Sequence, residues 1–169
     1  MQRIVAYRAL RSVNRAMPEI ALQLARDPSA AVRREVALSL RDVPFEQARE
    51  LLLIIARGYD GKDRAYLEAW GIGATGKEEA LYAALSSTQT EADATKWPRS
   101  YADLAWRLTP RDAVPAFAAR AKAATLEHSE RRKAITALGF IPSEAAANAL
   151  LDIAQHGGGD IKENPALWW

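Results

Sequence analysis

A phosphate-binding loop is the first chemistry that the sequence suggests, because residues 71–77 read GIGATGK. Such a loop presents backbone N–H groups to phosphate, and its lysine contacts the terminal phosphate groups. The next position should carry a serine or threonine hydroxyl for magnesium, but it is Glu78, whose carboxylate would repel phosphate. The preceding residues also have a helical rather than a strand pattern. We therefore interpret the glycines as a helix end and a turn between two paired helices.

The sequence offers few residues for metal or nucleophile chemistry. It contains no cysteine and two histidines, His128 and His156, neither of which has a second histidine three or four residues away. Zinc needs three or four converging nitrogen, sulfur or carboxylate ligands. His128 is expected in a loop before a helix, and His156 at a helix end, where a cation is favourable. The sequence therefore predicts no catalytic residue, no metal ligand and no cofactor, and we do not expect the chain to be an enzyme.

A basic stripe is predicted near the N-terminus. Arg8, Arg11 and Arg15 fall within about 60° of one another on a helical wheel, opposite apolar residues such as Val5 and Leu10. Such a stripe can contact the phosphates of nucleic acid or of a membrane surface. Residues 1–43 hold eight arginines and four acids, whereas the remainder holds fifteen basic and seventeen acidic residues. Because helical repeats that hold DNA carry basic residues along many helices, polyanion contact is the alternative hypothesis and a solvated face is the simpler one.

The elements that would position these residues recur along the chain. The helix-ending residues Pro44, Gly76, Pro110 and Pro142 recur with a period of about 33 residues, and two helix-like segments fill each interval. Alanine, leucine, glutamate and arginine dominate, and alternating runs of β-branched residues are absent, so the expected class is all-α. Together with an N-terminal pair, the period predicts about five helix pairs in residues 1–156, at about 3–26, 29–57, 63–87, 100–123 and 129–155.

The aligned repeats predict core and helix-start positions. Asp27 and Pro28 should end one helix, and at Ser29 an aspartate or serine oxygen could cap the next. Pro115 should lie in the first turn of a helix that begins late. An acid recurs where a first helical turn favours negative charge, at Glu46, Glu78, Asp112 and Glu144. The predicted core comprises Val32, Val36, Leu38, Trp70 and two repeat columns: Leu40, Ile72, Trp106 and Leu138; Ala48, Ala80, Val114 and Ala146.

The Asp27-Pro28 turn, the following Val32-Arg33 pair and helix ends such as Ile141-Pro142 resemble the HEAT repeat family. This resemblance implies a right-handed α-α superhelix, a HEAT/armadillo-like solenoid. More narrowly, residues 59–73 are similar to the HEAT section of exported multidomain bacterial proteins of planctomycete type, which join a sugar-dehydrogenase-like propeller to a cytochrome c domain. The resemblance implies a scaffold whose longer parent carries those domains, in a periplasmic or exported setting; without it, a cytoplasmic setting is expected.

By the family pattern, the second helix of each pair lines the concave surface that would meet a partner. Trp97, between Lys96 and Pro98 in the long connection of residues 88–99, is expected to cover a groove or to anchor a partner or neighbouring domain. The residues that the aligned repeats place on the outward face of the second helices are mixed in type and weakly charged. Such a face suits a protein surface better than a polyanion. The predicted partner-binding residues are Glu50, Tyr82, Ser86, Trp97, Arg120, Asn148 and Asp152.

These observations favour a non-catalytic protein-interaction or interdomain scaffold, whose partner is another protein or a neighbouring domain of the same polypeptide. Nucleic-acid binding of the DNA-repair type is the alternative, and a lyase-type activity on a bound chromophore is a third hypothesis that comes only from fold analogy. No apolar run is long enough to span a bilayer, and no signal peptide is evident. We expect residues 157–169 to be a linker or the start of a following element, with Trp168 and Trp169 at an interface.

Overall fold

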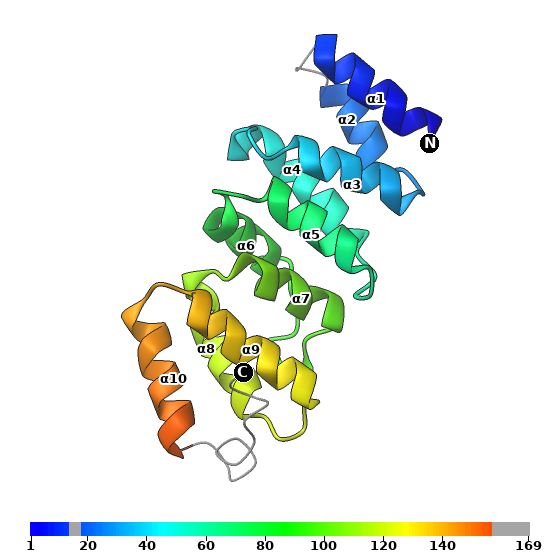
Figure 1. Ribbon diagram of the computed structural model, residues 1–169. Helices are drawn as coiled ribbons and strands as arrows, with labels where there is room; N and C mark the ends of the chain where they lie inside the picture. Colours follow the sequence, from blue (N-terminus) through cyan, green and yellow to red (C-terminus); the bar gives the residue numbers. More distant parts are fainter. Residues whose placement is uncertain (14–17, 157–169) are drawn as a thin grey trace. The chain divides into compact units, whose positions relative to one another are not determined.

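The computed structural model describes residues 1–13 and 18–156, and every regular element in these ranges is a helix. Figure 1 shows the helices joined by short turns, with a longer connection between α6 and α7 that includes a single 3₁₀ turn. The predicted all-α class is therefore confirmed.

The chain divides into two compact units, residues 1–85 (unit 1) and 86–169 (unit 2), which are described separately. Unit 1 contains α1 (Gln2–Val13), α2 (Pro18–Ala25), α3 (Ala30–Ser39), α4 (Phe45–Arg57), α5 (Arg64–Gly73) and α6 (Glu78–Ser86), whose last residue belongs to unit 2. Unit 2 contains the 3₁₀ helices η1 (Ala94–Lys96) and η2 (Arg111–Ala113) with α7 (Arg99–Leu108), α8 (Val114–Lys122), α9 (His128–Phe140) and α10 (Glu144–His156).

Unit 1 is organised around α3, which packs against α1, α2, α4 and α5. Val36 of α3, Leu52 of α4 and Trp70 of α5 are fully buried, and the indole Nε1 of Trp70 donates to the Leu52 carbonyl at 2.9 Å. A Cβ atom added to Gly73 would lie 2.3 Å from the carbonyl oxygen of Ala37. Helix α5 therefore approaches the backbone of α3 as closely as a residue without a side chain permits.

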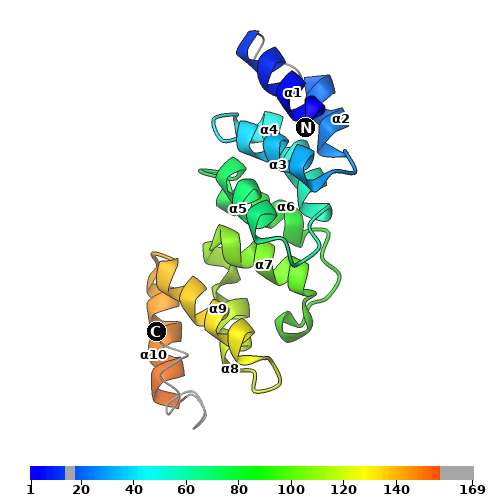
Figure 2. The ribbon, with the colours of Figure 1, turned by 45° about the vertical axis from the view of Figure 1, so that its right-hand side comes forward.

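Unit 2 has its core between α8, α9 and α10, which lie beside one another in Figure 2. Phe117, Leu138 and Ile153, one from each of these helices, are buried. Pro115 stands in the first turn of α8, directly after η2, so the predicted late helix start is confirmed. A proline is tolerated there because the first N–H groups of a helix have no intrahelical acceptor.

The turn before α3 uses the aspartate oxygen and not the serine oxygen, and one predicted core position of α3 is wrong. The Ser29 side chain makes no capping hydrogen bond; instead the Asp27 carboxylate accepts from the Ser29 N–H at 2.8 Å. The aspartate therefore forms the turn, and the serine contributes only its backbone. Val32, Val36 and Leu40 are buried as predicted, but Leu38 is 40% exposed.

The predicted core columns are correct at five positions and wrong at three. Leu40, Leu138, Ala48, Val114 and Ala146 are buried, whereas Ile72 is 37% exposed, Ala80 is exposed and Trp106 is half-buried. The alignment on helix-ending residues displaced these positions, because the helices do not end at the same distance from the aligned residues. Helix α3 ends at Ser39, before Pro44, whereas α5 continues to Gly73, closer to Gly76. Counted from helix starts, the third residues after Phe45, Glu78 and Val114 are all buried: Ala48, Leu81 and Phe117.

The predicted helix-start acids are confirmed, since Glu46, Glu78 and Glu144 lie in the first turns of α4, α6 and α10, and Asp112 in η2. Negative charge there complements the free N–H groups. His156 ends α10 as predicted, but His128 is the first residue of α9 rather than a loop residue. Glu127, the N-cap of this helix, has the non-helical dihedral angles φ −57° and ψ 147°.

Candidate interaction groove

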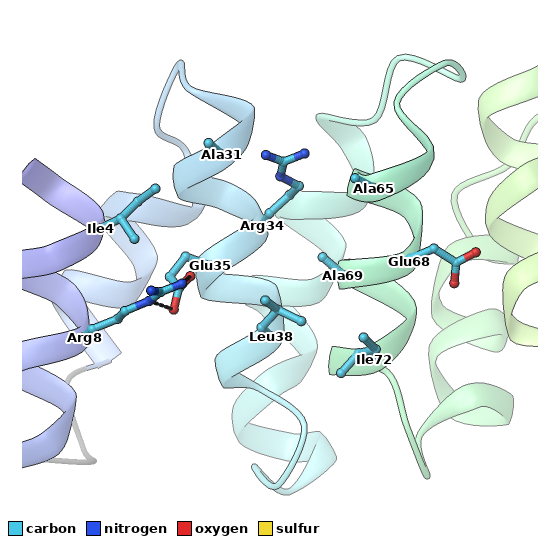
Figure 3. A pocket seen from close by; sticks show the side chains of 10 residues that line it. All are labelled: Ile4, Arg8, Ala31, Arg34, Glu35, Leu38, Ala65, Glu68, Ala69 and Ile72. Carbon is cyan, nitrogen blue, oxygen red and sulfur yellow. Dashed lines mark hydrogen bonds and ion pairs between the residues drawn. The ribbon is translucent and has the colours of Figure 1, made fainter. Parts of the chain in front are cut away.

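A groove of about 440 Å³ lies on unit 1, across one face of α1, α3 and α5. Figure 3 shows α3 in the middle, with α1 on one side and α5 on the other. Most of the side chains that line the groove are aliphatic, and charged side chains lie among them. The lining residues are Ile4, Arg8, Ala31, Arg34, Glu35, Leu38, Ala65, Glu68, Ala69 and Ile72.

The groove is built from equivalent positions of successive helices. Helices α3 and α5 have the same length, and their first residues, Ala30 and Arg64, are separated by the same interval as Leu38 and Ile72. Every groove residue of α3 therefore has a counterpart on α5, including the exposed pair Leu38 and Ile72. Positions spaced by three, four and seven residues share one face of a helix. The face that these positions define is the one that carries the groove.

The charged groups of the groove are held to different degrees. The Arg8 guanidinium donates two hydrogen bonds to Glu35, at 2.7 and 2.6 Å, which raises the pKa of Arg8 above its ordinary value. Glu68 accepts from Arg64 at 2.6 Å. Among the described residues, the Arg34 guanidinium forms an ion pair with Asp63 at 3.6 Å, longer than a hydrogen bond. Arg8 and Glu35 are thus a closed pair, whereas Arg34 retains hydrogen-bond donors.

Lys77, the lysine of the phosphate-loop pattern, is occupied within unit 1. Its side-chain Nζ donates to the carbonyls of Arg41, Gly73 and Thr75, at 2.7, 3.2 and 3.1 Å. Burial lowers the pKa of this ammonium below its ordinary value. Gly76 adopts φ +75° just after α5 ends, as the helix-end interpretation requires. The lysine thus satisfies free carbonyl groups at a helix end.

The predicted partner-binding residues do not form one surface. Glu50 and Asn148 are exposed and Ser86 is half-buried, but Tyr82 is only 7% exposed and Arg120 only 4%. Tyr82 and Arg120 were therefore wrongly predicted to face outward. Asp152 is partly exposed and pairs with Lys122 and with His156. Glu50 is the fifth residue after the start of α4. The same positions in α6 and α8 are Ala83 and Ala119, and both are exposed.

Arg120 belongs to a buried charge network in unit 2. Its guanidinium donates to the Ala94 carbonyl at 2.7 Å and to Glu130 at 2.9 Å. Lys133 donates to Glu130 at 3.0 Å and to Asp103 at 2.6 Å. The network links η1, α7, α8 and α9, so this arginine stabilises the unit instead of meeting a partner.

Trp97 is packed within its own connection rather than extended from it. Its indole Nε1 donates to the Glu91 carbonyl at 3.2 Å, and its ring meets Tyr101 edge to face at a centroid distance of 4.8 Å. The side chain is half-buried. Trp97 thus fixes the connection against α7, and its predicted partner contact remains a prediction.

The basic stripe of α1 is only partly present among the described residues. Arg8 is paired with Glu35, and Arg3 forms an ion pair with Asp27 at 2.8 Å. Arg11 is half-buried. Arg15, like Trp168 and Trp169, lies outside the described residues. Paired arginines have less charge to offer a phosphate.

The described ranges contain no group of three or more potential metal-ligating side chains, and none of their helices is long and apolar enough to cross a bilayer. Comparison with protein-family models, with curated proteins and with solved structures finds no match for this chain.

The groove itself was missed by sequence reasoning. Aligning the helix starts Ala30 and Arg64 would have paired Leu38 with Ile72.

Proposed function

We propose that this chain is a segment of a HEAT-like α-solenoid that acts as a non-catalytic protein-interaction or interdomain scaffold. The regular lengths and offsets of the helices support this architecture. Helices α3, α5 and α7 are equal in length and begin at Ala30, Arg64 and Arg99. Repeats of this kind bury a continuous core by stacking and leave a long surface for partners.

The contacts of Arg33 also support stacked helix pairs in unit 1. Its guanidinium donates to the carbonyls of Asp27 and Pro28, in its own turn, and to that of Gly58, in the next turn. Its Nε donates to the Tyr66 hydroxyl of α5 at 2.9 Å. The arginine of the Val32-Arg33 pair therefore connects one helix pair to the next.

The observation that carries the function is the groove of α1, α3 and α5, where aliphatic side chains are exposed side by side. Leu38 and Ile72 are each more than a third exposed, and Ala31 and Ala65 leave room for a partner. Exposed apolar groups that are contiguous and rimmed by polar residues mark interaction sites. In this proposal the partner meets first helices, and not the second helices that the family resemblance implies.

Site-specific cross-linking tests this function. A photo-reactive phenylalanine analogue is placed at Leu38 or Ile72 in the full chain, expressed in its source cell, and cross-linked proteins are identified by mass spectrometry. We expect the same protein or domain at both positions, and not at Leu151, an even more exposed leucine of α10 in unit 2. Cross-links at Leu151 equal to those at Leu38 and Ile72 would refute the groove as the working surface.

A further inference from the structure

We propose that the groove between α3 and α5 binds an amphipathic helix that carries an acidic residue one helical turn from a large apolar residue. This inference rests on the proposed function and specifies the partner of the same surface. It follows from two features that lie together on α3: an exposed leucine, and an arginine with donors to spare (Figure 3).

The apolar feature is formed by Leu38 and Ile72, at the same end of the groove in Figure 3. Their exposed fractions are 40% and 37%, whereas Ala69, which lines the groove one turn before Ile72 on α5, is 6% exposed. A small residue flanked by two larger ones leaves a depression. A partner leucine or phenylalanine placed there would remove the exposed parts of Leu38 and Ile72 from water, which is the main source of affinity in helix-in-groove recognition.

The charged feature is Arg34, which precedes Leu38 by one helical turn. Residues four apart on a helix have Cβ atoms about 5–6 Å from each other. A guanidinium has five N–H donors, yet the contact of Arg34 with Asp63 is 3.6 Å long, beyond hydrogen-bond distance. A carboxylate that approached along the groove could accept two parallel hydrogen bonds from Arg34.

The other charged groups near Arg34 are already held. Glu35 accepts both hydrogen bonds from Arg8, Glu68 accepts from Arg64, and one oxygen of Asp63 accepts from the Tyr66 N–H. A guanidinium whose ion pair, with the other oxygen of Asp63, is 3.6 Å long still has N–H donors for a single carboxylate. It does not fit a polyanion, whose binding requires many phosphate contacts. The partner therefore has an apolar and an acidic residue at helical spacing of four.

Two fluorescein-labelled, alanine-based helical peptides test this chemistry, with leucine and glutamate four residues apart in either order. Each is titrated with the full chain and followed by fluorescence anisotropy. We expect saturable binding of one peptide, weakened about tenfold or more by Leu38→Ser and by Arg34→Glu. Replacing the peptide's glutamate with lysine should weaken binding to the natural chain and restore binding to the Arg34→Glu variant.

The matched controls are Leu151→Ser and Arg49→Glu, which alter an exposed leucine and an exposed arginine that do not line the groove. Both should bind the peptide as the natural chain does. Circular dichroism should show unchanged helicity in all four variants, since Leu38 and Arg34 lie at the surface.

The outcomes separate this inference from the proposed function. Peptide binding that is indifferent to Arg34→Glu or to the lysine exchange overturns the inference, and so does the absence of peptide binding. If cross-links at Leu38 and Ile72 still identify a partner, the scaffold function stands without this partner chemistry. If those cross-links are also absent, both proposals fail.

Discussion

At the scale of single residues, three basic side chains of this protein act on its own backbone. Arg33, Lys77 and Arg120 all donate to carbonyl groups in turns or connections. Free carbonyls at helix ends need donors, and a long cationic side chain can reach several of them. A positive residue that looks available in the sequence is therefore often occupied in the fold.

Arg120 gives a direct test of this role. We expect Arg120→Met to lower the free energy of unfolding by about 3 kcal/mol, because it leaves the Ala94 carbonyl without its buried donor and Glu130 with Lys133 alone. Arg99→Met is the control, since Arg99 is 66% exposed and lies 3.7 Å from Asp103. Its loss should cost less than about 1 kcal/mol. Urea denaturation measures both, and equal effects would show that burial of Arg120 contributes nothing.

At the scale of elements, the spacing of helix starts determines which residues share a face. The interval from Ala30 to Arg64 aligns Leu38 with Ile72 and Ala31 with Ala65, and so produces the groove. The alignment on turn residues paired Leu40 with Ile72, which shifted α3 by two residues relative to α5. A shift of two residues turns a helix by about 200°, from a core position to a surface one.

The close approach of α5 to α3 predicts a strong effect of a single methyl group. We expect Gly73→Ala to destabilise the protein by about 2–3 kcal/mol, because the new Cβ would lie 2.3 Å from the Ala37 carbonyl oxygen and the helices would have to separate. Thermal unfolding followed by circular dichroism measures the loss.

Gly139→Ala in α9 is the matched control for this substitution. Nothing lies within 4 Å of a Cβ atom at Gly139. Alanine has the higher helix propensity, so this variant should gain up to about 1 kcal/mol. A Gly73→Ala variant as stable as Gly139→Ala would mean that α3 and α5 do not approach so closely.

At the scale of the whole molecule, the formal net charge of +2 hides an uneven distribution. The arginine excess of residues 1–43 is reduced by ion pairs with acids farther along unit 1, Arg26 with Glu50 and Arg34 with Asp63. Charge that is paired inside the protein contributes little to attraction of a polyanion. This distribution favours a protein partner over nucleic acid.

Salt-dependent retention on duplex DNA checks that conclusion. We expect weak binding that is lost at moderate salt and is reduced equally by two triple variants. One changes Arg8, Arg11 and Arg15 to glutamate, and the other changes the exposed residues Arg41, Arg49 and Arg57. Equal reduction indicates an effect of net charge alone. Each specific phosphate contact would instead steepen the slope of log binding constant against log salt concentration by about 0.9. Selective loss in the first variant would restore the nucleic-acid hypothesis.

The sequence by itself determined the helical class, the helix-start acids, the late start at Pro115 and the helix end at Gly76. These features depend on short-range backbone hydrogen bonding and on local propensity, which neighbouring residues specify. Only the tertiary structure decided that Tyr82 and Arg120 are buried, that Lys77 is occupied and that Leu38 and Ile72 are exposed together. Burial depends on how each helix is rotated against its neighbours, and contacts between residues distant in the chain set that rotation.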